Sequence, residues 1–117
     1  MIRKKEEFIS MHYEHMRDGK LYVDAVKFLE AEDAYGAGSF FGHATVPPGG
    51  SIGIHRHTGE FEVYYILSGS AKVWDNDEEH ILTAGDMMQC RDGDTHGIEN
   101  VGVDSLEFIA MVIKTRN

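Results

Sequence analysis

Two histidines and a glutamate lie close together in the segment IHRHTGEFEVYYILSG, residues 54–69. His55 and His57 are two residues apart, and side chains two apart in a β-strand point to the same face of the sheet. Residues 58–61 contain a glycine and predict a turn, so a return strand beginning at Glu62 would bring its carboxylate beside the two imidazoles. Two neutral nitrogens and one oxygen that converge on a point are typical of a transition-metal site with open positions.

A third histidine lies far along the chain and completes this hypothesis. His96 follows a turn at residues 92–94, and in an antiparallel barrel it can face the same interior as His55, His57 and Glu62. Three imidazoles and one carboxylate suit Mn²⁺ or Fe²⁺, and the same atoms accept Ni²⁺, Co²⁺, Cu²⁺ and Zn²⁺. Glu60 competes with Glu62 for the carboxylate position, but it falls in the predicted turn and we expect it to be exposed. Taken alone, an H-x-H pair is also found among surface and core histidines.

Composition limits the classes of protein to which the chain can belong. A length of 117 residues predicts a single domain, 1–117. A formal charge of −9 argues against nucleic acid as a partner, because phosphate binding needs a basic surface. The apolar runs are too short to cross a membrane, and no apolar stretch follows the basic N-terminus as in a secretory signal. The single cysteine, Cys90, excludes an internal disulfide and indicates the cytoplasm.

Turn signals recur every eight to twelve residues and predict an all-β fold, a barrel or sandwich. The predicted strands cover 21–28, 39–46, 54–57, 62–67, 70–75, 78–83, 87–91, 95–100 and 105–113. The last of these is apolar on both faces, so we expect it to be central. The first eighteen residues leave room for a short helix.

The chain resembles the cupin superfamily in two motifs. Its first motif, G-x5-H-x-H-x3–4-E-x6-G, is matched without a gap by Gly49, His55, His57, Glu62 and Gly69. The second, G-x5-P-x-G-x2-H-x3-N, is matched by Gly85, Gly93, His96 and Asn100. The one departure is Arg91 in place of the proline, at a position that shapes a turn. The resemblance implies a small antiparallel jelly-roll β-barrel with a core at about 38–114.

The same resemblance implies a role for each matched residue. His55, His57, Glu62 and His96 would be the metal ligands, the four glycines would occupy turns, and Asn100 would brace the backbone. The chain is most similar to small one-domain cupins described as oxalate-binding or oxalate-decarboxylase-like. Two-domain oxalate decarboxylases have an arginine three residues before the first ligand, where this chain has Ile52. We therefore expect binding of a small carboxylate, such as oxalate, rather than oxalate decarboxylation.

Three further residues are candidates for catalysis. Tyr64, two residues beyond Glu62, should point inward as a pocket wall or a phenol. His43 is either a general base beside the cavity or a structural histidine. Gln89 either bonds a metal-bound ligand or faces solvent. An apolar lining of the cavity is expected from Phe41, Ile66, Met87, Met88, Phe108 and Ala110.

Two classes of function remain open. The first is a metal-dependent enzyme, an oxidoreductase or dioxygenase, a decarboxylase or an isomerase, that acts on a small polar metabolite. The second is a non-catalytic cupin that binds a small ligand through its metal, or whose metal is structural or adventitious. The resemblance to small cupins also implies a homodimer that pairs through sheet edges.

Overall fold

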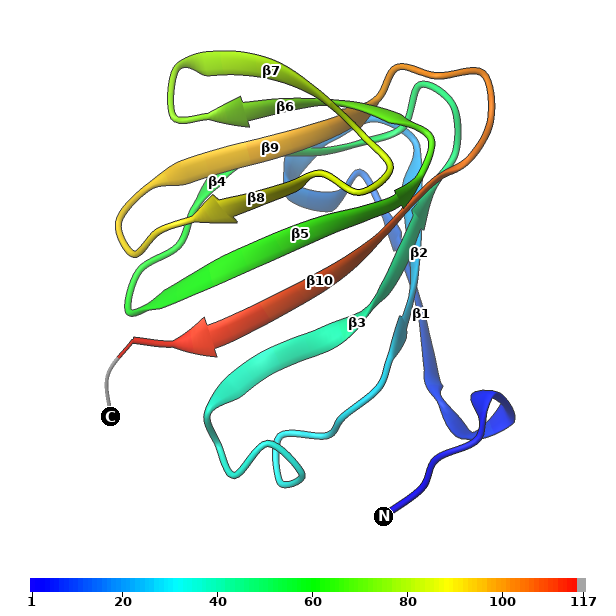
Figure 1. Cartoon of the computed structure of the whole chain (residues 1–117), viewed down its shortest axis with the longest axis vertical. Coiled ribbons are helices and arrows are strands. Elements are labelled where there is room, and N and C mark those ends of the chain that lie inside the picture. Colours follow the sequence, from blue (N-terminus) through cyan, green and yellow to red (C-terminus); the bar gives the residue numbers. More distant parts are fainter. Residues whose placement is uncertain (116–117) are drawn as a thin grey trace.

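The regular secondary structure of the chain consists almost entirely of β-strands, as shown by a computed structural model that describes residues 1–115 (Figure 1). The helical segments of this part of the chain are two 3-10 turns, η1 (Lys5–Glu7) and η2 (Met16–Asp18). None of its helices is long and apolar enough to cross a membrane. The strands are β1 (Ile9–Glu14), β2 (Tyr22–Lys27), β3 (Gly38–Val46), β4 (Ser51–Arg56), β5 (Glu60–Ser68), β6 (Ser70–Asp75), β7 (Glu78–Thr83), β8 (Met87–Cys90), β9 (Thr95–Asn100) and β10 (Leu106–Lys114).

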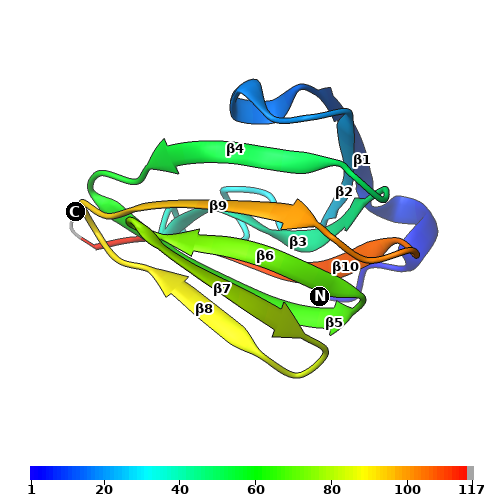
Figure 2. The same ribbon diagram turned by 90° about the horizontal axis from the view of Figure 1, so that it is seen from above.

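The strands form two antiparallel sheets that lie one over the other, as Figure 2 shows from above. One sheet has six strands in the order β1-β2-β3-β10-β5-β8, and the other has four in the order β4-β9-β6-β7. The predicted all-β jelly-roll fold is thus confirmed. Within residues 1–115, strand pairing does not continue from one sheet to the other, so the barrel is open rather than closed.

Strand β10 is central, as its apolar sequence predicts, and it pairs with β3 on one side and β5 on the other. Alternate residues of β10 are buried between the sheets: Leu106, Phe108, Ala110 and Val112. The first three of these pack with side chains from the facing sheet, such as Val73 and Ile98, into one apolar cluster. Burial of these side chains holds the two layers together.

The N-terminal segment contains a β-strand, whereas a short helix was possible from the sequence of the first eighteen residues. Residues Ile9–Glu14 form an edge strand that pairs with β2, and Met11 packs against the core. The rest of β1 is exposed, so its sequence lacks the apolar alternation that reveals a half-buried strand. Strand β5 also begins earlier than predicted, at Glu60 rather than Glu62.

The connection from β1 to β2 lies against β4, one of the two edge strands of the four-stranded sheet (Figure 2). The backbone N–H of Lys20 donates to Ser51 Oγ at 2.8 Å, and the N–H of Ser51 donates to Lys20 O at 3.0 Å. A Cβ on Gly53 would lie 1.9 Å from the carbonyl oxygen of Arg17, so only glycine permits this approach. The N-terminal connection and the strand that carries His55 are therefore closely packed.

Candidate metal centre

A bulge in β4 directs the histidines of the first motif toward the interior. In the pairing of β4 with β9, Ile52 faces Ile98 and His55 faces His96, and the register shifts between these pairs. In a regular strand, residues three apart point to opposite faces of the sheet. Ile52 lies three residues before His55, yet both side chains point inward and Ile52 is buried. The bulge accommodates the extra residue, as bulges beside functional sites commonly do.

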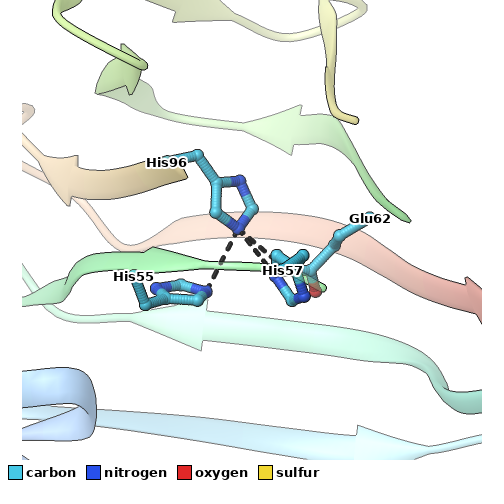
Figure 3. Close-up of side chains that lie close together, drawn as sticks. All are labelled: His55, His57, Glu62 and His96. Atoms are coloured by element: carbon cyan, nitrogen blue, oxygen red, sulfur yellow. Dashed lines mark hydrogen bonds and ion pairs between the residues drawn. The ribbon is translucent and has the colours of Figure 1, made fainter. Parts of the chain in front are cut away.

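The four residues of the predicted cluster come from both sheets and point toward one another (Figure 3). His55 lies on β4, His57 directly follows that strand, and His96 lies opposite His55 on β9. Glu62 lies on β5 in the other sheet. The cross-strand register thus explains how a histidine 39 residues beyond His57 reaches the same point.

The ligand atoms are close together and mostly buried. His57 Nε2 lies 2.9 Å from Glu62 Oε1, and His96 Nε2 lies 3.0 Å from the same oxygen. The Nε2 atom of His96 is also 3.1 Å from the Nε2 atoms of both His57 and His55, as the dashed lines in Figure 3 show. All four ligand atoms lie within 4.8 Å of one another.

The outer nitrogens of two rings have partners that orient the inner ones. His55 Nδ1 lies 2.7 Å from the carbonyl oxygen of Gly53, which can only accept a hydrogen bond. His57 Nδ1 lies 2.5 Å from Glu60 Oε2. With the proton on Nδ1, each neutral ring turns an Nε2 lone pair toward the cluster, which is the arrangement of metal-bound histidine. His96 Nδ1 is buried with no hydrogen-bond partner in the described chain, and this ring is held by stacking instead.

The protonation equilibria also favour a cation at this point. Burial would raise the pKa of Glu62, but hydrogen bonds that His57 and His96 donate from Nε2 outweigh it and lower the pKa to about 2. The bond with Glu62 also raises the pKa of His57, so a metal ion bound at Nε2 would take the place of that proton. Burial lowers the pKa of His55 and so favours its neutral form. An ionised carboxylate and converging imidazole lone pairs in a buried site need a compensating positive charge. The four residues are thus positioned to hold a metal ion.

The cluster opens into a cavity of about 170 Å³ between the sheets and the N-terminal connection. His55, His57 and Glu62 line it together with Glu60 and Tyr64. The other lining residues are mostly apolar: Tyr13, Met16, Arg17, Val23, Ala25, Ser39, Phe40, Ala44, Ile52, Phe108, Ala110 and Val112. A mostly apolar cavity with a few convergent polar groups is typical of a small-molecule site.

Tyr64 is the one of the three catalytic candidates that lines this cavity. It is 2% exposed, and its ring stacks on that of His96 at 4.8 Å between centroids with an interplanar angle of 16°. Burial, followed by the nearby charge of Glu62, raises the pKa of Tyr64 well above its usual range. The phenol therefore keeps its proton well above neutral pH and is able to donate a hydrogen bond.

The other two candidates lie outside the cavity. His43 lies on the outer face of the six-stranded sheet, where its Nε2 is 3.0 Å from Glu107 Oε1. Its neighbour Ala44 faces inward, so strand alternation turns the imidazole away from the cluster. Gln89 is exposed and faces a cleft beside Arg91 on the outside of β8.

The expected apolar lining is correct in part. Phe108 and Ala110 line the cavity, and Ile66 and Met88 belong to the buried core beside it. Phe41 and Met87 are exposed, and Phe40 lines the cavity in place of Phe41. Two adjacent phenylalanines give no indication of which one faces inward.

Two charged residues of the cavity were not identified from the sequence. Glu60 was expected in an exposed turn, yet it lies within β5 and contacts His57. Its spacing of three residues from His57 was the available signal. Arg17 lies some forty residues before the first ligand and reaches the cavity through the packing of the N-terminal connection. The stretch MRDGKLY that contains it resembles small oxalate-binding cupins, but this resemblance gives Arg17 no role.

The non-ligand motif residues have the structural roles that the family resemblance implies. Asn100 is buried, and its Nδ2 donates to the carbonyl oxygens of Val46 at 2.9 Å and Asp104 at 2.8 Å. Gly69 has φ of 94°, and a Cβ there would lie 3.0 Å from the backbone of Leu106. Both residues brace the turns that end the motif strands.

Comparison with known proteins agrees with this fold. Residues 42–112 match the Cupin domain family. An oxalate-binding protein from Thermotoga maritima is 37% identical over 113 residues, which cover 97% of this chain and 93% of that protein.

Solved structures give the same result. The crystal structure of a protein described as a predicted oxalate decarboxylase, also from Thermotoga maritima, has a TM-score of 0.92 at 37% identity, with 97% of this chain and 99% of that chain covered. The Cnp3 cupin domain of Schizosaccharomyces pombe shares the fold at 12% identity, with a TM-score of 0.71 over 92% of this chain and 83% of its own. The sequence match, the fold and the His₃Glu cluster together show that this chain belongs to the cupin family.

Proposed function

We propose that this cupin binds a small carboxylate, such as oxalate, through one divalent metal ion held by His55, His57, Glu62 and His96. The observation that carries the proposal is the buried cluster whose ligand atoms lie within 4.8 Å of one another and open into a cavity. When bound, the ion would supply positive charge and open coordination positions for a carboxylate oxygen. The name of the Thermotoga relative, an oxalate-binding protein, supports a ligand of this class.

We propose Mn²⁺ or Fe²⁺ as the native ion. The ligand set combines three imidazoles with one carboxylate and contains no thiolate, which is the softer ligand that favours Zn²⁺ and Cu⁺. Ni²⁺, Co²⁺, Cu²⁺ and Zn²⁺ remain competitors, because the general affinity order places most of them above Mn²⁺ and Fe²⁺.

Binding without turnover is the form of the proposal that the cavity supports best. Tyr64 is held in its protonated form, and Glu60 is already paired with His57 Nδ1. Neither residue is therefore a free base. The alternative is a metal-dependent oxidoreductase, lyase or isomerase, in which Tyr64 would donate a proton to the bound ligand.

The first experiment measures metal content by inductively coupled plasma mass spectrometry on untagged protein from cells grown with Mn, Fe, Ni and Zn. We expect about one Mn or Fe per chain in the wild type and loss of metal in the His55→Ala/His96→Ala variant. His80→Ala, an exposed histidine outside the cluster, is the matched control and should keep its metal. Calorimetric titration with oxalate should then show binding that disappears after treatment with a chelator. Wild-type protein without metal would overturn the proposal.

We also propose that the protein is a cytoplasmic homodimer that pairs at the β5–β8 edge. Tyr65 and Met87 face each other across these strands on the outer face, and both are exposed, as is Leu67. Exposed apolar side chains beside an unpaired edge strand favour contact with a second copy. Light scattering of the wild type should give the mass of a dimer, and Tyr65→Lys with Leu67→Lys should give a monomer with an unchanged fold.

A further inference from the structure

We infer that Arg17 is the anion-recognition residue of the metal cavity, and that the cavity therefore selects small dicarboxylates over monocarboxylates. The inference rests on the proposed function, since it concerns the part of the ligand that points away from the metal. It assigns to the N-terminal connection a role in choosing the ligand.

The first support is the distribution of charge in the cavity. Among the lining residues in the described part of the chain, Arg17 is the one with a permanent positive charge. The other charged groups are the carboxylates of Glu60 and Glu62, and the remaining wall is largely apolar. A second carboxylate on the ligand needs a positively charged partner in these surroundings, because burial of an unpaired charge costs free energy.

The second support is that the guanidinium is available. Within residues 1–115 it forms no hydrogen bond or ion pair with the protein, unlike Arg3, which is held by Asp33. Arg17 is an exposed residue that lines the same cavity as Glu62 and Tyr64, so its side chain is open both to solvent and to a ligand in the cavity. Guanidinium groups bind carboxylates through two parallel hydrogen bonds, which selects a planar anion in a fixed orientation.

The third support is the backbone that carries Arg17. Arg17 has φ of 55°, in the left-handed region, and His15, Asp18 and Leu21 beside it have φ of 51°, 61° and 55°. Such conformations are unfavourable for residues other than glycine and are concentrated at functional sites. Here they are held by the contacts of the connection with β4, including the close approach of Arg17 O to Gly53. The strained connection thus fixes Arg17 relative to the strand that carries His55.

The test compares oxalate with acetate on Mn²⁺-loaded, desalted protein by calorimetric titration. Arg17→Gln should weaken oxalate binding by about 10- to 100-fold, the range for a lost hydrogen bond to a charged group. Acetate affinity and metal content should not change, because neither depends on a group at the far side of the ligand. Arg17→Lys should restore part of the oxalate affinity. Arg91→Gln, which removes the same charge from an exposed position outside the cavity, is the matched control and should bind oxalate like the wild type.

The outcomes separate the inference from the function on which it rests. Equal oxalate affinity in Arg17→Gln and the wild type would overturn the role of Arg17 and leave the proposed function standing. A metal-loaded wild type that binds neither acid would overturn the proposed function itself. A parallel loss of acetate and oxalate binding in Arg17→Gln would also count against the inference, because it would show damage to the metal site rather than loss of selectivity.

Discussion

The Nδ1 atom of His57 lies 2.5 Å from Glu60 Oε2, while the Nε2 atom of the same ring lies 2.9 Å from Glu62 Oε1. The imidazole is thus placed between two carboxylates that have different tasks. Glu62 belongs to the ligand cluster, whereas Glu60 fixes the orientation of the ring and keeps the proton on the outer nitrogen.

Glu60→Gln is predicted to weaken metal binding by about 10- to 100-fold, the usual effect of losing the carboxylate behind a ligating histidine. The amide still fills the space but does not carry the charge that makes His57 a stronger ligand. Competition with a fluorescent metal chelator measures the affinity. Glu78→Gln, at an exposed position on β7, is the control. A variant with wild-type affinity would show that Glu60 is only a neighbour of the ring.

Tyr64→Phe is predicted to keep the metal and to weaken oxalate binding by up to about 10-fold, as for one neutral hydrogen bond. Because burial raises the pKa of the phenol well above its usual range, the wild-type donor stays protonated between pH 6 and 9. The ratio of the two affinities should therefore be constant over this range in calorimetric titrations. A ratio that falls with rising pH would indicate that the phenol ionises and would contradict the role as a permanent donor.

Gly53→Ala is predicted to destabilise the fold by about 1–3 kcal/mol, because the new Cβ would lie 1.9 Å from the backbone oxygen of Arg17. Neither the strand nor the connection can move without loss of the contacts between them. Urea denaturation measures the change in free energy of unfolding. Gly102→Ala is the control, since its Cβ would meet only ordinary contacts at 3.5 Å or more. Equal stability of the two variants would show that the connection is loosely attached.

His12 is predicted to titrate above its ordinary pKa of 6.5, because it shares a hydrogen bond with Asp24 across strands β1 and β2. A raised pKa means that the folded state binds the proton more tightly, so this pair stabilises the fold below pH 6.5 and the contribution is lost as pH rises through the folded pKa. Proton NMR titration of the wild type and of Asp24→Asn gives the comparison. The variant should return toward 6.5, and a wild-type value at or below 6.5 would contradict the pairing.

The sequence predicts the centre of the molecule better than its periphery. The His55–His57 spacing and the apolar β10 follow strand periodicity, and the family motifs add His96 before any register is known. The bulge at β4 was not foreseen, since it depends on how β4 and β9 pair. It nevertheless leaves the two histidines on one face, because they lie on the same side of the irregularity.

The remaining features are set by tertiary packing. Phe40 and Phe41 are chemically alike, and only the register of β3 with β10 decides which one reaches the cavity. Strand β1 has only one partly buried side chain, so its sequence shows no alternation of apolar and polar residues. Its hydrogen-bonded pairing with β2 is what makes it a strand. The placement of Arg17 depends on left-handed backbone conformations at residues such as Arg17 and Leu21, whose types do not signal them. The glycine of the connection, Gly19, has an extended backbone with φ of −77°.

The ligand cluster contains residues from both sheets, and the strands of the two sheets do not pair with each other in the described part of the chain. An ion held by His55, His57, Glu62 and His96 would consequently be a reversible cross-link between the two layers. Unlike a disulfide, it would act by binding the folded state rather than by restricting the unfolded chain. Any species that binds only the folded chain adds RT ln(1 + [M]/Kd) to its stability, or about 2.7 kcal/mol when the free metal exceeds its Kd a hundredfold. The melting temperature would then rise with the logarithm of free metal, and metal supply would help to set the lifetime of the folded protein.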